Sequence, residues 1–554
     1  MASLKPAPNP IVLRPGMRIG SVAAETDDDF LFSCFVHHPA VSDSLDVASR
    51  GMVIAGSTGS GKTAILRYIE RTCENVVTVN PMEMSLSYVS NSDILRFVQA
   101  IGGDLDLLFL ALWKHVLCLE FIRLRYKVND EAKSKGVFQR LRERFLNEPR
   151  KNKSLAYLRE WEGKFWETMD ENIRHITEKY ERDLQAEFGA DLGKWKQGGQ
   201  YEKRMSTERK AELVARSKKI INADQLRELS GVIEMLAEEN DDHMTKFYIL
   251  VDRLDERWVD VSIKFKLIRS LIEAIKSFRK IKNLKILIAM CSDVLEKVVQ
   301  ESKDHGFQRE KFEDYFLNLR WRKSQIKEIL DKRVSLLFKR QYSPSANVTF
   351  SDLFSKSVGG IDAFTYIIDR TLMRPRDAIV FVNLCLDGSE GRDVVPSSVI
   401  REAEVQYSKS RRAALEDEWR IAFPSLSKLL DFIRSFRSPT VTFEQMCAVE
   451  NLQEVCLGIS SDGACNSDPL YELANCALSG KRIVEFVYSI ISVLYRVGAI
   501  GIKKGPQERF HWSNVDSPMI SAADLGEDTR IRVHLMLYGA LGLIGLDEKK
   551  SRNA

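Results

Sequence analysis

The sequence predicts an α/β protein: a parallel sheet interrupted by a long helical insertion, followed by a helical lid and a C-terminal α+β domain. Three observations lead to this prediction. Short apolar runs alternate with helical stretches between residues 30 and 98, the alternation returns between 246 and 290, and a charged helical segment separates the two. Strands that alternate with helices form parallel sheets, because each helix carries the chain back to the start of the next strand.

Composition excludes several classes of protein. The 554 residues are 44% apolar and 29% charged, as in globular proteins with several domains. Because 82 basic residues nearly balance 78 acidic ones, any polyanion-binding site must be a local patch. Nine cysteines without a C-x-x-C pair exclude a disulfide framework and a zinc spacing, and favour a reducing cytoplasm. Residues 1–20 lack a secretion signal. Charges interrupt the apolar run 105–124, so we expect a buried helix there and no membrane association.

The composition shifts along the chain predict its domains. The order is an N-terminal arm (1–30), an α/β core (31–122 and 246–322), a charged helical insertion (123–245), a helical lid (323–408), a charged linker (409–418) and a winged-helix-like C-terminal domain (419–554).

A glycine-rich loop follows the first apolar strand. The segment matches G-x-x-x-x-G-K-[ST] in full between a strand and a helix, the context in which this motif cradles phosphates; its residues are Gly56, Ser57, Thr58, Gly59, Ser60, Gly61, Lys62 and Thr63. The glycines let the backbone amides turn toward a phosphate. We expect Lys62 to reach the β and γ phosphates and Thr63 to bind Mg²⁺. The sequence therefore predicts a P-loop NTPase with a nucleotide and Mg²⁺ as cofactors.

A second acidic site follows the buried strand at 247–251. Asp252 ends this strand, as the Walker B aspartate does, and is the predicted second Mg²⁺ residue. Arg253 comes next, where many ATPases have the glutamate that activates water, and Asp255 and Glu256 follow. Either acid could orient water or be a solvated loop charge, and both interpretations stay open. The chain lacks an [N/T]-K-x-D guanine-reading motif, which favours ATP over GTP.

The insertion allows two interpretations. Between residues 123 and 219 there are 25 Lys or Arg and 17 Asp or Glu, a local net charge of +8. Basic residues between 140 and 153 alternate with Phe138, Phe145 and Tyr157, a pattern compatible with nucleic-acid binding. The many acids indicate an ordinary solvated helical face instead. A minor alternative is an ABC or SMC-like ATPase, with Leu229-Ser230-Gly231 as its signature and the insertion as a coiled-coil arm.

The C-terminal region predicts a winged helix. A helix at 481–496 leads into two short strands with a basic turn between them. Winged helices bind DNA or proteins, and the sequence leaves this open. The candidate DNA-contacting residues, on the helix and the wing, are Lys481, Arg482, Arg496, Lys503, Lys504 and Arg509.

Three segments together carry a family resemblance. They are A-G-S-T-G-S-G-K-T-A-I, F-Y-I-L-V-D-R-L-D-E-R-W and R-P-R-D. Over residues 30–390 the chain resembles bacterial P-loop ATPases of the KAP, STAND and origin-recognition-like branch of AAA+ proteins. In that group the strand after Walker B usually ends in a polar or basic sensor, whereas Cys291-Ser292-Asp293 stands here. The resemblance implies a C-terminal winged helix and a setting in mobile elements or anti-phage defence.

The resemblance also assigns roles to four arginines. It implies that Arg374 or Arg376 in the lid senses the γ-phosphate, and that Arg320 or Arg322 reaches the nucleotide of a neighbouring subunit. Capping or surface roles for each of them stay open. A finger of this kind makes self-association an expectation.

Two functional hypotheses follow. In the first, ATP and Mg²⁺ operate a switch that hydrolysis resets, with DNA or a separate effector protein as partner, because no nuclease or hydrolase constellation is present. In the second, the chain is a nucleic-acid-binding or scaffold protein whose nucleotide site does not hydrolyse. A small-molecule phosphotransferase lacks a recognisable acceptor site.

Overall fold

The computed structural model describes residues 12–82, 89, 91–145, 147, 152–164, 167–197, 201–220, 224–238, 244–256, 258–301, 313–505, 507–516, 520, 525–526 and 528–543. Their contacts divide the chain into two units. The sheet unit comprises Pro39–Gly56 and Ile65–Asn318, and the C-terminal unit comprises Met1–His38, Ser57–Ala64 and Leu319–Ala554. Each unit is described by itself.

A five-stranded, all-parallel sheet forms the centre of the sheet unit, which confirms the predicted α/β class. Its order is β2-β3-β4-β1-β5, with β1 (Val53–Gly56), β2 (Val76–Val79), β3 (Phe247–Val251), β4 (Leu284–Cys291) and β5 (Phe316–Asn318). Strands β1, β3 and β4 are buried throughout, as expected for strands whose residues are all apolar or small except for the buried Lys285 of β4. Gly56 pairs with Cys291, and Val251 pairs with Ile288. The carboxyl ends of β1, β3 and β4 therefore share one edge of the sheet.

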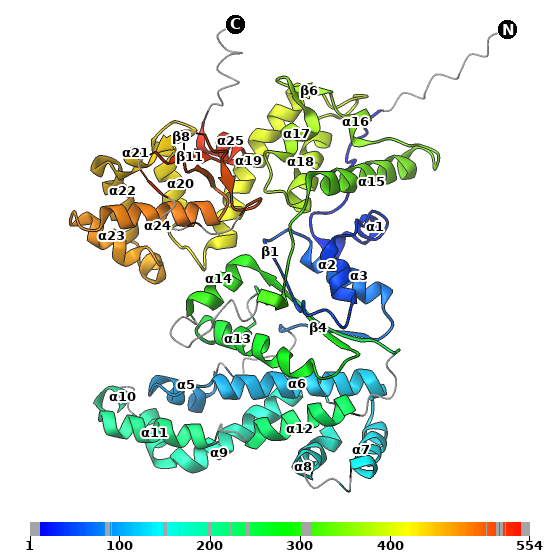
Figure 1. Cartoon of the computed structure of the whole chain (residues 1–554), viewed down its shortest axis with the longest axis vertical. Helices are drawn as coiled ribbons and strands as arrows, with labels where there is room; N and C mark the ends of the chain where they lie inside the picture. Colours follow the sequence, from blue (N-terminus) through cyan, green and yellow to red (C-terminus); the bar gives the residue numbers. More distant parts are fainter. Residues whose placement is uncertain are drawn as a thin grey trace, which may run out of the picture. The chain divides into compact units, whose positions relative to one another are not determined.

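Helix α6 (Asp106–Tyr126) is the central helix of this unit, and the prediction of a buried helix at 105–124 is confirmed. It packs against α13 (Val261–Phe278), α12 (Asp224–Glu238) and β3 (Figure 1). Apolar residues therefore occur on all of its sides. Other helices of the sheet unit are α2 (Pro39–Leu45), α5 (Asp93–Ala100) and α14 (Ser292–Glu301). Helix α3 (Lys62–Thr72) begins within the phosphate loop.

The insertion is helical, as the sequence predicts. Besides α12 it contains α7 (Glu131–Phe145), α8 (Asn152–Trp161), α9 (Met169–Gln197), α10 (Tyr201–Arg204) and α11 (Thr207–Ile220). Its apolar side chains, among them Phe188 and Leu229, join one continuous core with those of the sheet. Figure 1 shows these helices gathered alongside α6. The insertion therefore packs on the core and does not project as an arm.

The C-terminal unit begins with helices around a small hairpin. They are α15 (Lys323–Gln341), α16 (Phe350–Leu353), α17 (Ala363–Ile368), α18 (Pro375–Asp387) and α19 (Ser397–Trp419); the hairpin strands are β6 (Ser357–Val358) and β7 (Ile361–Asp362). Residues 409–418, expected to form a linker, lie inside α19. Opposite charges in this segment lie four residues apart and form pairs along the helix, such as Arg412 with Glu416. These pairs stabilise a helix, so the charged composition is compatible with helical structure.

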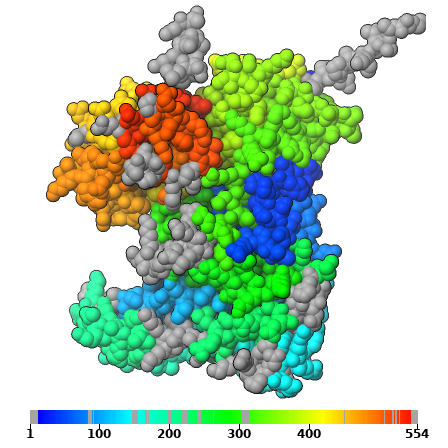
Figure 2. Space-filling view, in the orientation of Figure 1, coloured from blue at the N-terminus to red at the C-terminus, as the bar shows by residue number. Residues whose placement is uncertain are grey.

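The chain then forms a second helical group with a four-stranded antiparallel sheet. Its elements are α20 (Leu426–Ser435), β8 (Thr440–Thr442), α21 (Phe443–Cys447), α22 (Val449–Ser460), α23 (Tyr471–Leu478), α24 (Ile483–Arg496), β9 (Ile500–Lys503), β10 (His511–Trp512), β11 (Arg530–Val533) and α25 (Tyr538–Leu541). In the space-filling view these yellow-to-red residues form one lobe beside the green to yellow-green residues of α15–α18 (Figure 2).

The two-stranded ribbon predicted after α24 is present as β9 and β10, but it belongs to a larger sheet that the sequence does not predict. The sheet order is β10-β9-β11-β8, so β9 pairs with β10 on one side and with β11 on the other. Strand β8 comes from a distant part of the chain, which a local pattern does not reveal. Pro506 of the expected turn lies outside the described residues.

Among the residues that the structure describes, no helix is long and apolar enough to cross a membrane.

Candidate functional site

The phosphate loop leaves β1 at Gly56 and enters α3 at Lys62. Gly59 has φ +80° and Gly61 has φ +100°, values that side-chain-bearing residues rarely adopt, whereas Gly56 belongs to the strand. The amide of Ser60 donates to the carbonyl of Ser57 at 3.1 Å, which closes the turn. The curled conformation of the loop therefore requires glycine at two of the three predicted positions, 59 and 61.

Lys62 and Ser60 face the inside of this loop. The Lys62 side chain folds back so that Nζ donates to the carbonyl of Ser57 at 3.0 Å, and the residue is only 8% exposed. Among the described residues, the buried hydroxyl of Ser60 has no hydrogen-bond partner. A cradle of curled backbone with a sequestered ammonium and an unsatisfied hydroxyl fits an anionic phosphate group.

Trp321, which the sequence analysis passed over, covers the loop. Its indole Nε1 donates to the carbonyl of Ser60 at 2.7 Å. A Cβ added to Gly61 would lie 3.7 Å from the Trp321 ring, and His38 packs on that ring at 5.2 Å between centroids. The backbone of this loop is therefore fixed by an aromatic side chain from the start of the helical domain.

Arg374 lies at the loop, but within a buried ion network. Its Nη1 donates to the carbonyl of Thr58 at 3.1 Å and to Glu418 Oε2 at 2.8 Å. Glu418 also accepts from the amide of Thr58 at 3.2 Å and from Arg411 at 3.2 Å, and Arg411 in turn pairs with Asp377. Burial would lower the pKa of Arg411, but the carboxylates of Asp377 and Glu418 outweigh it and raise that pKa.

Arg376 contacts the loop through its backbone. Its amide donates to the carbonyl of Gly59 at 3.3 Å, and a Cβ on Gly59 would come within 2.7 Å of the Arg376 Cβ. The guanidinium Nε donates to the carbonyl of Val22 in the N-terminal arm. The two predicted lid arginines therefore both reach the loop, and the hydrogen bonds they form there go to its carbonyls.

In the sheet unit, Asp252 follows β3 at the edge where Gly56 ends β1. Its Oδ1 accepts from the amide of Arg253, which adopts φ +60°. Glu256 is exposed and pairs with Arg253 at 3.7 Å. Asp255 is exposed too, and Cys291 Sγ donates to its Oδ2 at 3.6 Å. The position predicted for a sensor thus holds a thiol that contacts one of the two candidate water-orienting acids.

Lys264 of α13 shapes the loop that carries these acids. It is 3% exposed, and its Nζ donates to the carbonyls of Asp255 and Glu256, each at 2.8 Å. Burial lowers the pKa of Lys264, while Asp255 and Asp293 act to raise it. A helical lysine gives no local signal of this role, so the sequence alone does not predict it.

The remaining predicted arginines point elsewhere. Arg320 is exposed and donates to the carbonyl of Asp516 at 2.6 Å. Arg322 is exposed at the start of α15, where its amide donates to Gln325. In the single chain neither makes a described contact with the phosphate loop.

The candidate DNA-contacting residues lie around α24 and the turn after β9. Arg482 pairs with Glu485, and Arg509 pairs with Asp516, each at 2.5 Å. Lys481 and Lys504 are exposed, and Lys503 and Arg496 are half-buried. Acidic neighbours therefore offset the charges of Arg482 and Arg509.

In the insertion, the aromatic residues that alternate with basic ones are buried. Phe138, Phe145 and Tyr157 are 3–6% exposed and belong to the core. Arg150 and Lys151 lie outside the described residues. Ser230 lies inside α12, where its hydroxyl donates to the carbonyl of Leu226. Base stacking by these rings, and a phosphate-binding role for Ser230, find no support in this packing.

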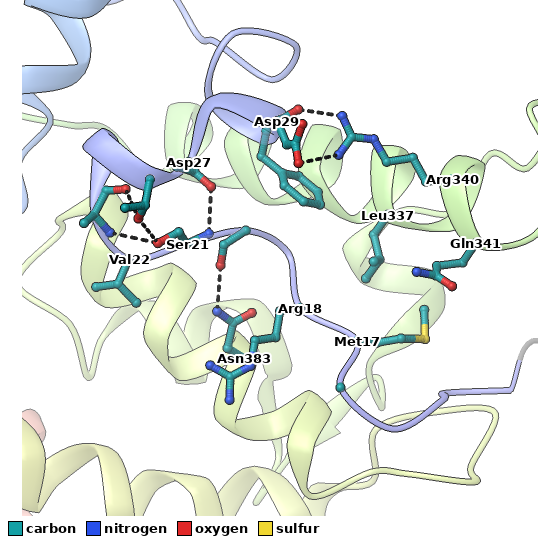
Figure 3. A pocket seen from close by; sticks show the side chains of 15 residues that line it. Met17, Arg18, Ser21, Val22, Asp27, Asp29, Leu337, Arg340, Gln341 and Asn383 are labelled. Carbon is teal, nitrogen blue, oxygen red and sulfur yellow. Dashed lines mark hydrogen bonds and ion pairs between the residues drawn. The ribbon is translucent and has the colours of Figure 1, made fainter.

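A cavity of about 590 Å³ lies between the N-terminal arm, α15 and α18 (Figure 3). Its polar groups largely satisfy one another: Asn383 donates to the carbonyl of Gly20, Arg340 to the carbonyl of Asp29, and the amide of Ser21 to Asp27. Arg18, which also lines it, pairs with Asp387. This arrangement holds the arm against the helices and leaves few groups for a ligand.

Comparison with known proteins identifies one segment of the chain. Residues 324–416, from α15 through most of α19, match the family model described as the FunZ-associated C-terminal helical domain. No curated protein matches the chain. The matched segment covers nearly all of the predicted lid (323–408) and most of the predicted linker (409–418), and it contributes Arg374, Arg376 and Arg411 to the contacts around the loop.

Proposed function

We propose that the chain is an ATP-binding, Mg²⁺-dependent switch of the P-loop class. The observation that carries the proposal is the complete phosphate-loop motif between a buried parallel strand and a helix, with its interior lysine and two left-handed glycines. Lys62 and the loop amides hold the phosphates, Thr63 and Asp252 hold Mg²⁺, and the missing guanine-reading motif favours ATP.

Hydrolysis is the proposed reset step. Bound Mg²⁺ would withdraw charge from the phosphates and polarise them toward attack by water. Asp255 is the favoured water-orienting acid, because its carboxylate contacts the Cys291 thiol and Lys264 fixes its backbone. Glu256 is the alternative. Arg374 and Arg376 are the proposed sensors of the γ-phosphate, through the loop that they contact. In a self-assembled state, Arg320 and Arg322 are the candidate arginine fingers for the nucleotide of a neighbouring subunit.

The C-terminal sheet and α24 are proposed as a winged-helix-like module that binds DNA or a separate effector protein. The order of helices and antiparallel strands supports this, together with the half-buried Lys503 at the end of β9 and the exposed Lys504 that follows it. Bacterial anti-phage defence is the setting that the resemblance to KAP and STAND ATPases suggests.

The second candidate is a scaffold or nucleic-acid-binding protein whose nucleotide site does not hydrolyse. The sensor-position Cys291 and the Arg253 after Asp252 favour it. The two candidates differ in turnover and in their tolerance of a substitution at Lys62.

The test is ATP binding and phosphate release with Mg²⁺, with and without DNA. Lys62→Ala should weaken ATP binding by about 100-fold or more, because it removes a buried charged partner. Asp252→Asn should reduce turnover by about 100-fold while the protein stays folded. Lys280→Ala, which removes an exposed ion pair, is the control. ATP binding without turnover under all conditions favours the scaffold, and absence of ATP binding refutes both.

A further inference from the structure

Glu418 is the penultimate residue of α19, and its side chain is 3% exposed. One carboxylate oxygen accepts the amide of Thr58 in the phosphate loop, and the other accepts from Arg374 and Arg411. Arg374 returns to the same loop residue by donating to the carbonyl of Thr58. Both backbone groups of Thr58 are therefore held by one buried ion pair.

We propose that Glu418 is a positioning residue that holds the phosphate loop through Thr58 and couples nucleotide binding to the arrangement of α19. The inference rests on the proposed nucleotide site. It assigns Arg374 a role in this coupling that acts through Glu418 and the loop backbone.

The charges of the network explain how it responds to a ligand. Arg374 and Arg411 balance Glu418 and Asp377, and the four side chains are 8% exposed or less. Within the described residues, Nε of Arg374 and Nε of Arg411 are buried without a partner, so the network has unused donors. Nucleotide phosphates beside Thr58 would repel the Glu418 carboxylate and attract the two guanidiniums. Bound nucleotide thus weakens the contact between Glu418 and the loop.

Helix α19 can transmit this change. It packs against α18 and β6 in the segment that matches the FunZ-associated domain, and against α20 and α25 beyond it. The coupling free energy between two sites is the same in both directions. If bound nucleotide weakens the contact between Glu418 and Thr58, then that contact weakens nucleotide binding by the same free energy.

The test compares full-length wild type with Glu418→Gln by hydrogen exchange and ATP titration calorimetry. Without nucleotide, Glu418→Gln should speed exchange in a peptide covering residues 53–64 at least threefold. With Mg²⁺ it should strengthen ATP binding about 5- to 10-fold, at the low end of the usual range for coupled sites. Glu416→Gln is the matched control, because Glu416 lies two residues away on α19 and pairs only with Arg412 among the described contacts. It should change neither quantity.

A second variant guards against misfolding. Glu418→Gln combined with Arg374→Gln leaves the Arg411–Asp377 pair intact and no unbalanced charge, and it should still speed exchange in the loop. Unchanged loop exchange in both variants overturns the inference, as does unchanged ATP affinity in Glu418→Gln. If the wild type binds no ATP, the proposed function and the coupling fail together, while faster loop exchange would still establish that Glu418 anchors the loop.

Discussion

Trp321 donates its indole N–H to the carbonyl oxygen of Ser60 across 2.7 Å, and so a residue at the start of the helical domain fixes the phosphate loop. The contact satisfies the carbonyl of a loop residue that is only 2% exposed. It also places an aromatic ring over Gly61, where a larger residue would meet it. The loop's shape therefore depends on residues far along the chain.

Replacing Trp321 with phenylalanine should loosen the loop. The ring remains but the donor is lost, and an unpaired buried carbonyl costs about 1–3 kcal/mol. We expect ATP binding to weaken about 3- to 10-fold, equivalent to about 1 kcal/mol, as measured by calorimetry. Trp419→Phe is the control, because the buried Nε1 of Trp419 has no partner among the described residues. Equal effects of the two substitutions would contradict this role.

Gly59→Ala should disturb the conformation of the loop more than the same substitution at another glycine with a positive φ. Alanine at φ +80° is strained by about 1 kcal/mol or more, and its Cβ would also collide with the Cβ of Arg376 at 2.7 Å. Gly16→Ala has a similar φ of +75° with nothing within 4 Å, so it measures the backbone strain alone. ATP affinity should fall for Gly59→Ala and stay unchanged for Gly16→Ala. Retained affinity in Gly59→Ala would show that the loop tolerates the collision.

Charge reversal at the turn after β9 tests DNA binding. Lys503→Glu with Lys504→Glu should weaken binding to double-stranded DNA by at least about tenfold at low salt and reduce its salt dependence, because fewer counterions are released. Lys133→Glu with Lys135→Glu makes the same change on exposed positions of α7, the rival basic region. A larger loss in the α7 variant would move the DNA site to the insertion. Unchanged binding in both would favour a protein partner.

His115 should make the protein sensitive to mild acid. Burial lowers its pKa from 6.5 to about 3, and its Nδ1 is hydrogen-bonded to Tyr157. The unfolded chain binds a proton below pH 6.5 while the folded chain does not, so stability present above pH 6.5 declines as the pH falls toward 3. The decline is about 1.4 kcal/mol per pH unit for one histidine.

His115→Asn should flatten this acid decline while keeping a hydrogen-bonding group near Tyr157. The measurement is the urea midpoint between pH 7 and pH 5. His534 is also buried, with its pKa lowered to about 4, so His534→Asn tests whether the C-terminal unit contributes equally. An acid decline that persists unchanged in His115→Asn would assign the sensitivity to other groups.

The sequence by itself determined the local features of this protein. The apolar runs 247–251 and 286–290 lie in buried parallel strands, because a strand that is covered on both faces has a continuous apolar sequence. The glycines at 59 and 61 have left-handed φ values, because the curled loop excludes other residues. The largely apolar run at 105–124 is a buried helix, because apolar side chains on all sides of a helix must be removed from water.

Only the tertiary structure decided which distant residues meet. Glu418 contacts Thr58 across 360 positions, and Lys264 fixes the loop after β3 from a helix whose pattern shows only amphipathic spacing. By its composition, the charged segment 409–418 suggests a solvated linker. In the structure it forms ion pairs between α18 and α19, and such pairs leave no periodic signal in the sequence. Strand β8 joins β11 from a remote part of the chain. Periodicity reports which face of an element is buried, whereas the partner on that face depends on how the elements pack.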